Sequence, residues 1–211
     1  MKTGISQNLA SIVPKRLYSE KSKYSYYDSD YSIIGDAGIP PLFLDKPFKA
    51  ETGNVQAWKQ ANLIAKKDTE SGLYLFGDAG VGKSHLAAWT LQERLRNDEE
   101  SDIAYVNLVE LLTTMQTNFD GENDKNMLFI QNIVDVELLV LDDIGAEKTS
   151  DWTNSILYLI IDGRYNRVKQ TIITTNFGET KLASLIGDRL VSRLHAMCEV
   201  VEIKSEDKRT T

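Results

Sequence analysis

The sequence predicts an α/β fold in which helices cover both faces of a five-stranded parallel sheet. Three observations predict it. Short apolar runs alternate along the chain with segments of helical periodicity, most of the runs are apolar at successive positions, and a glycine-rich turn joins the first run to a helix. Strands that are apolar on both faces must be buried on both sides, so we expect a three-layer sandwich.

The strands are expected where a short aliphatic run stops at a glycine or a polar residue. The run from Leu138 to Leu141 is the plainest, because four aliphatic residues follow one another before an acidic pair. In chain order the predicted strands are 72–76, 103–107, 138–142, 171–175 and 198–204.

The helices are expected where apolar residues recur three or four positions apart. In 84–97, for example, Leu91 and Leu95 lie on the same side as Leu86. The predicted helices are 54–67, 84–97, 108–119, 151–166 and 180–196, the last in one or two pieces. The stretch 120–137 receives no element.

Composition excludes several classes of protein. The 211 residues are 42% hydrophobic and 26% charged, as in a soluble globular chain. No run of 18 apolar residues could span a membrane, and no apolar leader follows Met1, so we expect a cytoplasmic protein without a membrane partner. One cysteine, Cys198, and two histidines, His85 and His195, argue against a disulfide framework and a zinc site.

Charge is distributed unevenly along the chain. The formal net charge is −7, yet residues 1–27 carry five basic residues against one acidic residue, which leaves −11 for the remainder. Affinity for nucleic acid comes mainly from lysine and arginine that neutralise phosphates. Any contact with nucleic acid therefore needs a local patch or a partner protein.

Two regions are expected. Residues 1–38, rich in Tyr, Lys and Ser, have no steady apolar period and are predicted to be a flexible extension. Such an extension could dock on a partner, stack on single-stranded bases, or simply pack locally. Pro40 and Pro41 exclude a helix at the boundary, and 39–211 is predicted to form the α/β domain.

A phosphate-binding loop follows the first predicted strand. The pattern G-x-x-x-x-G-K-[ST] is matched without exception by Gly77, Asp78, Ala79, Gly80, Val81, Gly82, Lys83 and Ser84. The glycines let backbone N–H groups turn toward phosphate oxygens, and the following helix adds its unpaired N–H groups. Lys83 is predicted to reach the β- and γ-phosphates of ATP, and the Ser84 hydroxyl to bind Mg²⁺. A chance glycine-rich turn would not explain the Lys–Ser pair.

An acidic pair ends the third predicted strand. Asp142 and Asp143 follow four aliphatic residues, which is the Walker B pattern. In P-loop enzymes the first acid holds magnesium, and we expect its strand to lie beside the strand that precedes the loop. We assign the metal to Asp142 and the orientation of the attacking water to Asp143. The alternative is a strand that ends in solvated acids.

These motifs resemble the DnaC/DnaI-type helicase loaders and their IstB relatives, a branch of the AAA+ ATPases. The segment 141–148, Leu-Asp-Asp-Ile-Gly-Ala-Glu-Lys, is typical of that branch. Similar stretches occur in the same order at 39–43, 82–87, 172–176, 187–194 and 198–201. The resemblance runs from about residue 38 to the C-terminus and implies a P-loop NTPase (AAA+) fold.

The resemblance also implies roles for single residues. Asn176 would be the sensor that binds the attacking water or the γ-phosphate, and Arg193 the arginine finger that completes a neighbouring subunit's site. Arg189, one turn earlier, and Arg209 are weaker nucleotide-binding candidates. The nucleotide-binding segment extends to His85, whose ring we expect to pack. The alternatives are a cap for Asn176, surface salt bridges for the two helical arginines, and a frayed tail for Arg209.

The sequence departs from the family in two respects. The bacterial loaders carry a larger N-terminal domain, and the short extension here suggests a phage or mobile-element version. We also expect no C-terminal helical lid, because the chain ends soon after the fifth predicted strand. The segment 118–132 would lie near single-stranded DNA in the family, but it is acidic at its start and receives no DNA contacts.

The leading functional hypothesis is an ATPase that uses ATP and Mg²⁺ to load a replicative DNA helicase onto single-stranded DNA during replication initiation. It would self-associate in an ATP-dependent manner, with Arg193 acting in trans. The runner-up is an IstB-like ATPase that helps a transposase on duplex DNA. A small-molecule kinase fits less well, since no arginines cluster between 108 and 137. A nucleotide-gated adaptor without turnover is a further alternative.

Overall fold

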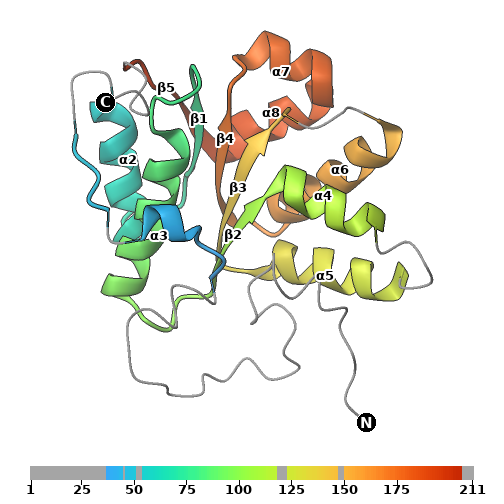
Figure 1. Cartoon of the computed structure of the whole chain (residues 1–211), viewed down its shortest axis with the longest axis horizontal. Helices are drawn as coiled ribbons and strands as arrows, with labels where there is room; N and C mark the ends of the chain where they lie inside the picture. The colour runs from blue at the N-terminus through green and yellow to red at the C-terminus, as the bar shows by residue number, and fades with distance from the viewer. Residues whose placement is uncertain (1–36, 45, 51–53, 118–122, 147–149, 206–211) are drawn as a thin grey trace.

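The computed structural model describes residues 37–44, 46–50, 54–117, 123–146 and 150–205. Its centre is a parallel sheet of five strands in the order β2-β3-β4-β1-β5 (Figure 1). The strands are β1 (Gly72–Phe76), β2 (Ile103–Asn107), β3 (Leu138–Ile144), β4 (Gln170–Thr175) and β5 (Cys198–Glu202). The predicted five-stranded parallel α/β fold is confirmed.

Helices cover both faces of the sheet (Figure 1). One face carries α2 (Val55–Ala65) and α3 (Lys83–Asn97), with the short 3-10 helix η3 (Pro41–Phe43) against α3. The helices of the other layer are α4 (Leu108–Thr117), α5 (Asn123–Asp135), α6 (Asp151–Asn166), α7 (Glu179–Ile186) and α8 (Asp188–Met197). Among the described residues, no helix is long and apolar enough to span a membrane.

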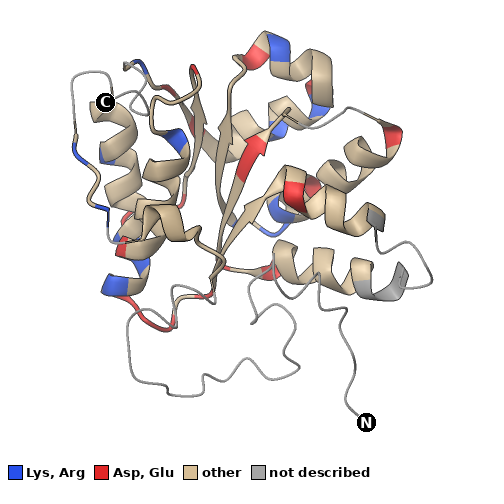
Figure 2. Cartoon of the chain, viewed as in Figure 1, with Lys and Arg blue, Asp and Glu red and all other residues tan. Residues whose placement is uncertain are grey.

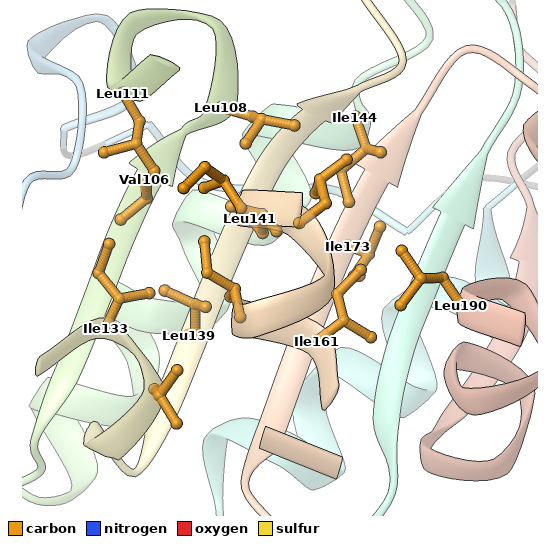
Figure 3. Close-up of a cluster of buried hydrophobic side chains, with 14 of the residues drawn as sticks. Val106, Leu108, Leu111, Ile133, Leu139, Leu141, Ile144, Ile161, Ile173 and Leu190 are labelled. Atoms are coloured by element: carbon orange, nitrogen blue, oxygen red, sulfur yellow. The ribbon is translucent and has the colours of Figure 1, made fainter. Parts of the chain in front are cut away.

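Successive side chains of each central strand pack alternately into two separate hydrophobic cores, one on each face of the sheet. In β3, Leu138 and Val140 pack with α2 and α3, whereas Leu139 and Leu141 pack with the helices of the other layer. Figure 3 shows this second core, where Leu139 and Leu141 lie among side chains from the neighbouring strands and helices. The alternation explains why the strands are apolar at successive positions.

The structure adds one helix to the sequence predictions and shifts the ends of several elements, among them β3, which continues two residues past Asp142. Residues 123–135 form α5, which we did not predict, and its Phe129, Ile130 and Ile133 are buried. The apolar periodicity of this segment is short and follows a polar stretch, so the sequence gives only a weak helix signal. The apolar face is evident in the structure, where it packs against α6. The last predicted strand is shorter than expected, because β5 ends at Glu202.

A buried arginine joins α5, α6 and β4. Arg164 of α6 is completely buried and donates to the carbonyls of Ile133, Val134 and Val136 at the C-terminal end of α5. It also donates to Gln170 O and Thr171 Oγ1 at the start of β4. Burial lowers the pKa of Arg164 to about 9, so the guanidinium remains charged at neutral pH and binds the negative end of the helix dipole.

Candidate nucleotide-binding site

The predicted phosphate-binding loop, the acidic pair and Asn176 lie together at the carboxyl edge of the sheet. The loop 77–84 follows β1, the acidic pair lies near the end of β3, and Asn176 follows β4. Figure 2 shows the acidic stretch near the tip of β3. In parallel α/β sheets, ligands bind at this edge.

The backbone of the loop has the shape that its glycines permit. Gly82, immediately before α3, has a φ of 98°, in the left-handed region that L-amino acids other than Asn and Asp rarely adopt. Gly77 is needed for a second reason, since a Cβ there would lie 2.4 Å from the carbonyl oxygen of Ile203. The first N–H groups of α3 therefore remain available for an anion.

Lys83 is held inside this loop. Its side chain is 5% exposed, and Nζ donates to Gly77 O at 2.9 Å, to Asp78 O at 2.7 Å and to Asn176 Oδ1 at 2.8 Å. The ammonium group thus joins the loop to the end of β4. These contacts bring Lys83 and Asn176, two residues predicted to bind ATP, into one site.

A threonine connects the acidic pair to β4. Thr174 Oγ1 donates to Asp142 Oδ1 at 2.5 Å and accepts from the backbone N–H of Asp143 at 2.9 Å. Asp142 is 5% exposed, and Asp143 is half-buried with a φ of 65°. The pairing of β3 with β4 is irregular between Leu141 and Ile144, so this left-handed residue sits in a local bulge. Asp143 is a strained position of the kind that clusters at functional sites.

The expectation about the strand neighbouring β1 is wrong. β4, not β3, lies beside β1, so the sensor strand separates the loop strand from the acidic strand. Periodicity along one chain cannot fix strand order, which depends on how the crossover helices pack. The observed order places Thr174 and Asn176 between Lys83 and Asp142. The sequence analysis missed Thr174, although a polar residue in a buried strand was a usable signal.

His85 contacts the segment before α2. Its ring stacks on Phe43 with centroids 5.8 Å apart, meets Phe48 edge-on at 5.3 Å, and places Nε2 3.1 Å from Lys46 O. These contacts agree with the expectation that the ring packs. They give no support to a direct contact of the His85 side chain with nucleotide.

Arg193 and Arg189 lie on α8 and contact α6. Arg193 Nη2 is 2.5 Å from Asp162 Oδ1, and its guanidinium lies 5.3 Å from the ring centre of Tyr158 and 5.7 Å from that of Tyr165. Arg189 lies over Tyr158 at 5.3 Å. Neither arginine is brought to Lys83 by these contacts. Arg209, and residues 1–36 of the predicted extension, fall outside the described residues.

The donor set at this edge fits Mg²⁺ and a triphosphate. The loop offers backbone N–H groups and the Lys83 ammonium, while Ser84 and Asp142 are oxygen ligands of the kind magnesium prefers. Magnesium bound with phosphates needs only one or two protein oxygens. The buried hydroxyl of Tyr105, which has no hydrogen-bond partner within the described part of the chain, faces the same side of the sheet as Asp142. The residues present therefore suit ATP and Mg²⁺.

The fold and the loop define a P-loop protein of the AAA+ type. The chain belongs to the family of IstB-like ATP binding proteins, whose model matches residues 49–211. The replicative helicase loader DnaC of Escherichia coli K12 is 26% identical over 166 residues, which cover 75% of this chain and 66% of that protein. The uncharacterised protein YdaV of the same strain is 28% identical over 169 residues, 77% of this chain and 66% of its own length. The chain thus spans just under two thirds of these relatives.

Solved structures agree with this assignment. A crystal structure of the DnaC helicase loader is 28% identical with a TM-score of 0.68, covering 78% of this chain and 100% of that one. AMPPCP-bound DnaA from Aquifex aeolicus shares the fold at 23% identity and a TM-score of 0.68, over 81% of this chain and 53% of its own. The predicted resemblance is confirmed at the level of family and fold.

Proposed function

We propose that the protein is a cytoplasmic ATPase that loads a replicative DNA helicase onto single-stranded DNA. The observation that carries the ATPase part is the joining of Lys83, Asn176, Thr174 and Asp142 along one edge of the sheet. The helicase part is supported by similarity to DnaC proteins in sequence and in structure.

Each site residue has its own proposed role in phosphoryl transfer. Lys83 and the loop N–H groups bind the β- and γ-phosphates, and Ser84 and Asp142 hold Mg²⁺, which neutralises charge on the phosphate oxygens. Asp143 orients and polarises the attacking water. Asn176, already bonded to the Lys83 ammonium, exchanges that contact for the water or the γ-phosphate.

A neighbouring subunit completes the site. Arg193 contacts α6 of its own chain rather than the loop, so we propose that it acts in trans when ATP assembles the subunits. A fixed guanidinium stabilises the negative charge that builds up on the transferring phosphoryl group. Arg189, over the same tyrosine ring, lies beside it in this interface.

The test is ATP turnover measured for the full chain alone, with single-stranded DNA, with a replicative helicase, and with both, each against Lys83→Ala. We expect turnover to depend on the partner and on DNA, and helicase to appear on a closed single-stranded circle only with ATP. Binding of ATP without turnover under every condition would instead support a nucleotide-gated adaptor.

The match to the IstB-like family favours one second candidate, an ATPase helper of a transposase. The two candidates differ in partner and in DNA. Capture of a helicase together with a preference for single strands supports the loader. Capture of a transposase together with a preference for duplex DNA supports the helper.

A further inference from the structure

Tyr105, on β2, carries a hydroxyl that none of the proposed roles uses. Its side chain is 2% exposed, and its hydroxyl has no hydrogen-bond partner among the residues that the structure describes. An unpaired buried hydroxyl is costly, and native proteins rarely keep one without a ligand or a water to bind. The backbone N–H of Tyr105 donates to Ala37 O at 2.8 Å, so the main chain is tied down independently of the hydroxyl.

The strand register directs this side chain toward the nucleotide site. Tyr105 pairs with Val140 in β3, and Asp142 lies two residues further along the same face. Diagonal neighbours of this kind are within reach of a long aromatic side chain. Tyr105 and Val140 pack with Leu86 in the core beneath α3, whose first turn contains Ser84.

Asp142, Ser84 and, more weakly, Asp143 are the polar groups that act on Tyr105. Burial, followed by the charge of the Asp142 carboxylate, raises the pKa of Tyr105, and the Ser84 hydroxyl acts in the opposite direction. Asp142 and Ser84 are both close enough to act on the hydroxyl, but neither meets it with the full geometry of a hydrogen bond.

We propose that Tyr105 is a positioning residue for the metal end of the nucleotide site. With Mg²⁺ and nucleotide bound, its hydroxyl donates to the Asp142 carboxylate and holds that carboxylate beside Ser84. Thr174 already donates to Oδ1 of Asp142, so Tyr105 supplies a second fixed donor from the opposite neighbouring strand. This inference rests on the proposed ATP site and adds a residue to it.

The test compares Tyr105→Phe with the unaltered chain in two measurements. The first is the thermal unfolding midpoint without nucleotide, which should stay the same or rise, because the hydroxyl has no hydrogen bond to lose. The second is the affinity for a fluorescent ATP analogue in excess EDTA and in Mg²⁺. The EDTA value should not change, while the gain produced by Mg²⁺ should fall about tenfold, as expected for one hydrogen bond to a charged group.

Tyr74→Phe is the matched control, since the Tyr74 hydroxyl donates to Phe177 O at 3.2 Å. It should lower the unfolding midpoint without changing the effect of Mg²⁺. If Tyr105→Phe instead behaves like Tyr74→Phe, the hydroxyl is structural and the inference is wrong.

A double variant makes the test independent of folding effects. In an Asp142→Asn background, Tyr105→Phe should have little further effect on Mg²⁺-dependent binding, because the partner has lost its charge. Equal effects in both backgrounds would overturn the inference. If the unaltered chain shows no Mg²⁺-dependent binding at all, it is the proposed ATP site that fails.

Discussion

The chain holds its two proposed phosphate-binding cations in different ways. Lys83 is fixed mainly by the backbone, with two loop carbonyls and Asn176 around its ammonium. Arg193 is held by side chains of α6, and the side chain remains 15% exposed. Its ion pair with Asp162 lies off the line of a hydrogen bond, and Nε is buried without a partner among the described residues.

This difference bears on the roles that we propose for one subunit and its neighbour in ATP binding and hydrolysis. Lys83 already lies inside the loop that we propose binds phosphate, so its ammonium needs only to turn from the loop carbonyls to a phosphate bound by the same subunit. Arg193 lies on a different helix, where Asp162 and two tyrosine rings hold its guanidinium. We therefore propose that it leaves Asp162 for a phosphate bound by a neighbouring subunit.

The largest effect on ATP binding is expected at Lys83. Lys83→Ala removes the ammonium that the loop holds, so ATP affinity should fall by about 100-fold or more, as for the loss of charge-assisted bonds to phosphate. Titration with a fluorescent ATP analogue measures it, with the exposed Lys66→Ala as the control. Near-normal affinity in Lys83→Ala would show that the loop is not the nucleotide site.

Arg193→Ala should separate binding from turnover. Since Arg193 contacts α6 and not the loop, ATP affinity should stay within about threefold, while hydrolysis in the assembled complex falls by about 10³-fold or more. The control is Arg167→Ala, another arginine in an ion pair, with Asp135. Mixing Arg193→Ala with Lys83→Ala should restore activity, because one subunit supplies the finger and the other the loop. Normal hydrolysis by Arg193→Ala in the complex contradicts the trans role.

Asp143→Asn should affect chemistry and leave stability unchanged. Asn tolerates the left-handed backbone of this position, so the free energy of unfolding should change by less than about 0.5 kcal/mol. Turnover should fall by about 100-fold, the contribution of a residue that polarises the attacking water. Asp143→Val places a β-branched side chain in the same left-handed backbone, so it should lower both the turnover and the stability. Turnover at the normal rate in Asp143→Asn would leave Asp143 only a structural role.

The smallest effect is expected at Asp162. Asp162→Asn removes a charge beside Arg193 but keeps an oxygen acceptor in the same place, so it should destabilise the chain by about 1 kcal/mol, with ATP affinity unchanged. Cys198, which follows α8 directly, provides the measurement, because burial raises the pKa of its thiol to about 12 and protects it from alkylation at neutral pH. Alkylation of Cys198 should become at most about fivefold faster, because a loss of about 1 kcal/mol raises the population of the opened chain by that factor. A much larger acceleration would mean that Asp162 holds α8 in place.

The same thiol gives a pH dependence. Its pKa is raised on folding, so between about 9 and 12 the unfolded chain binds fewer protons at Cys198 than the folded chain does. The contribution of Cys198 to stability is therefore constant below pH 9 and declines as the pH rises above it.

Motifs that are local in sequence were predicted correctly and in detail. The strand–loop–helix around Lys83 and the aliphatic strand before Asp142 follow from residues that are neighbours in the chain, where periodicity and glycine content carry the information. Helix α5 was missed because its apolar face is short and is buried only by packing against α6. Its last turn is also capped by a residue distant in sequence, Arg164 of α6. The neighbour of β1 was predicted wrongly, because strand order depends on packing between distant segments.

The amino-acid pattern alone was enough to predict the fold class and the strand, loop and helix around Lys83, since turns, helix starts and buried strands depend on interactions a few positions apart. The folded chain was needed to show that Thr174 joins the acidic pair, that Asn176 pairs with Lys83, and that Asp162 holds Arg193. These pairs lie 32, 93 and 31 positions apart, and only the packed sheet and helices bring them within hydrogen-bonding or ion-pairing distance.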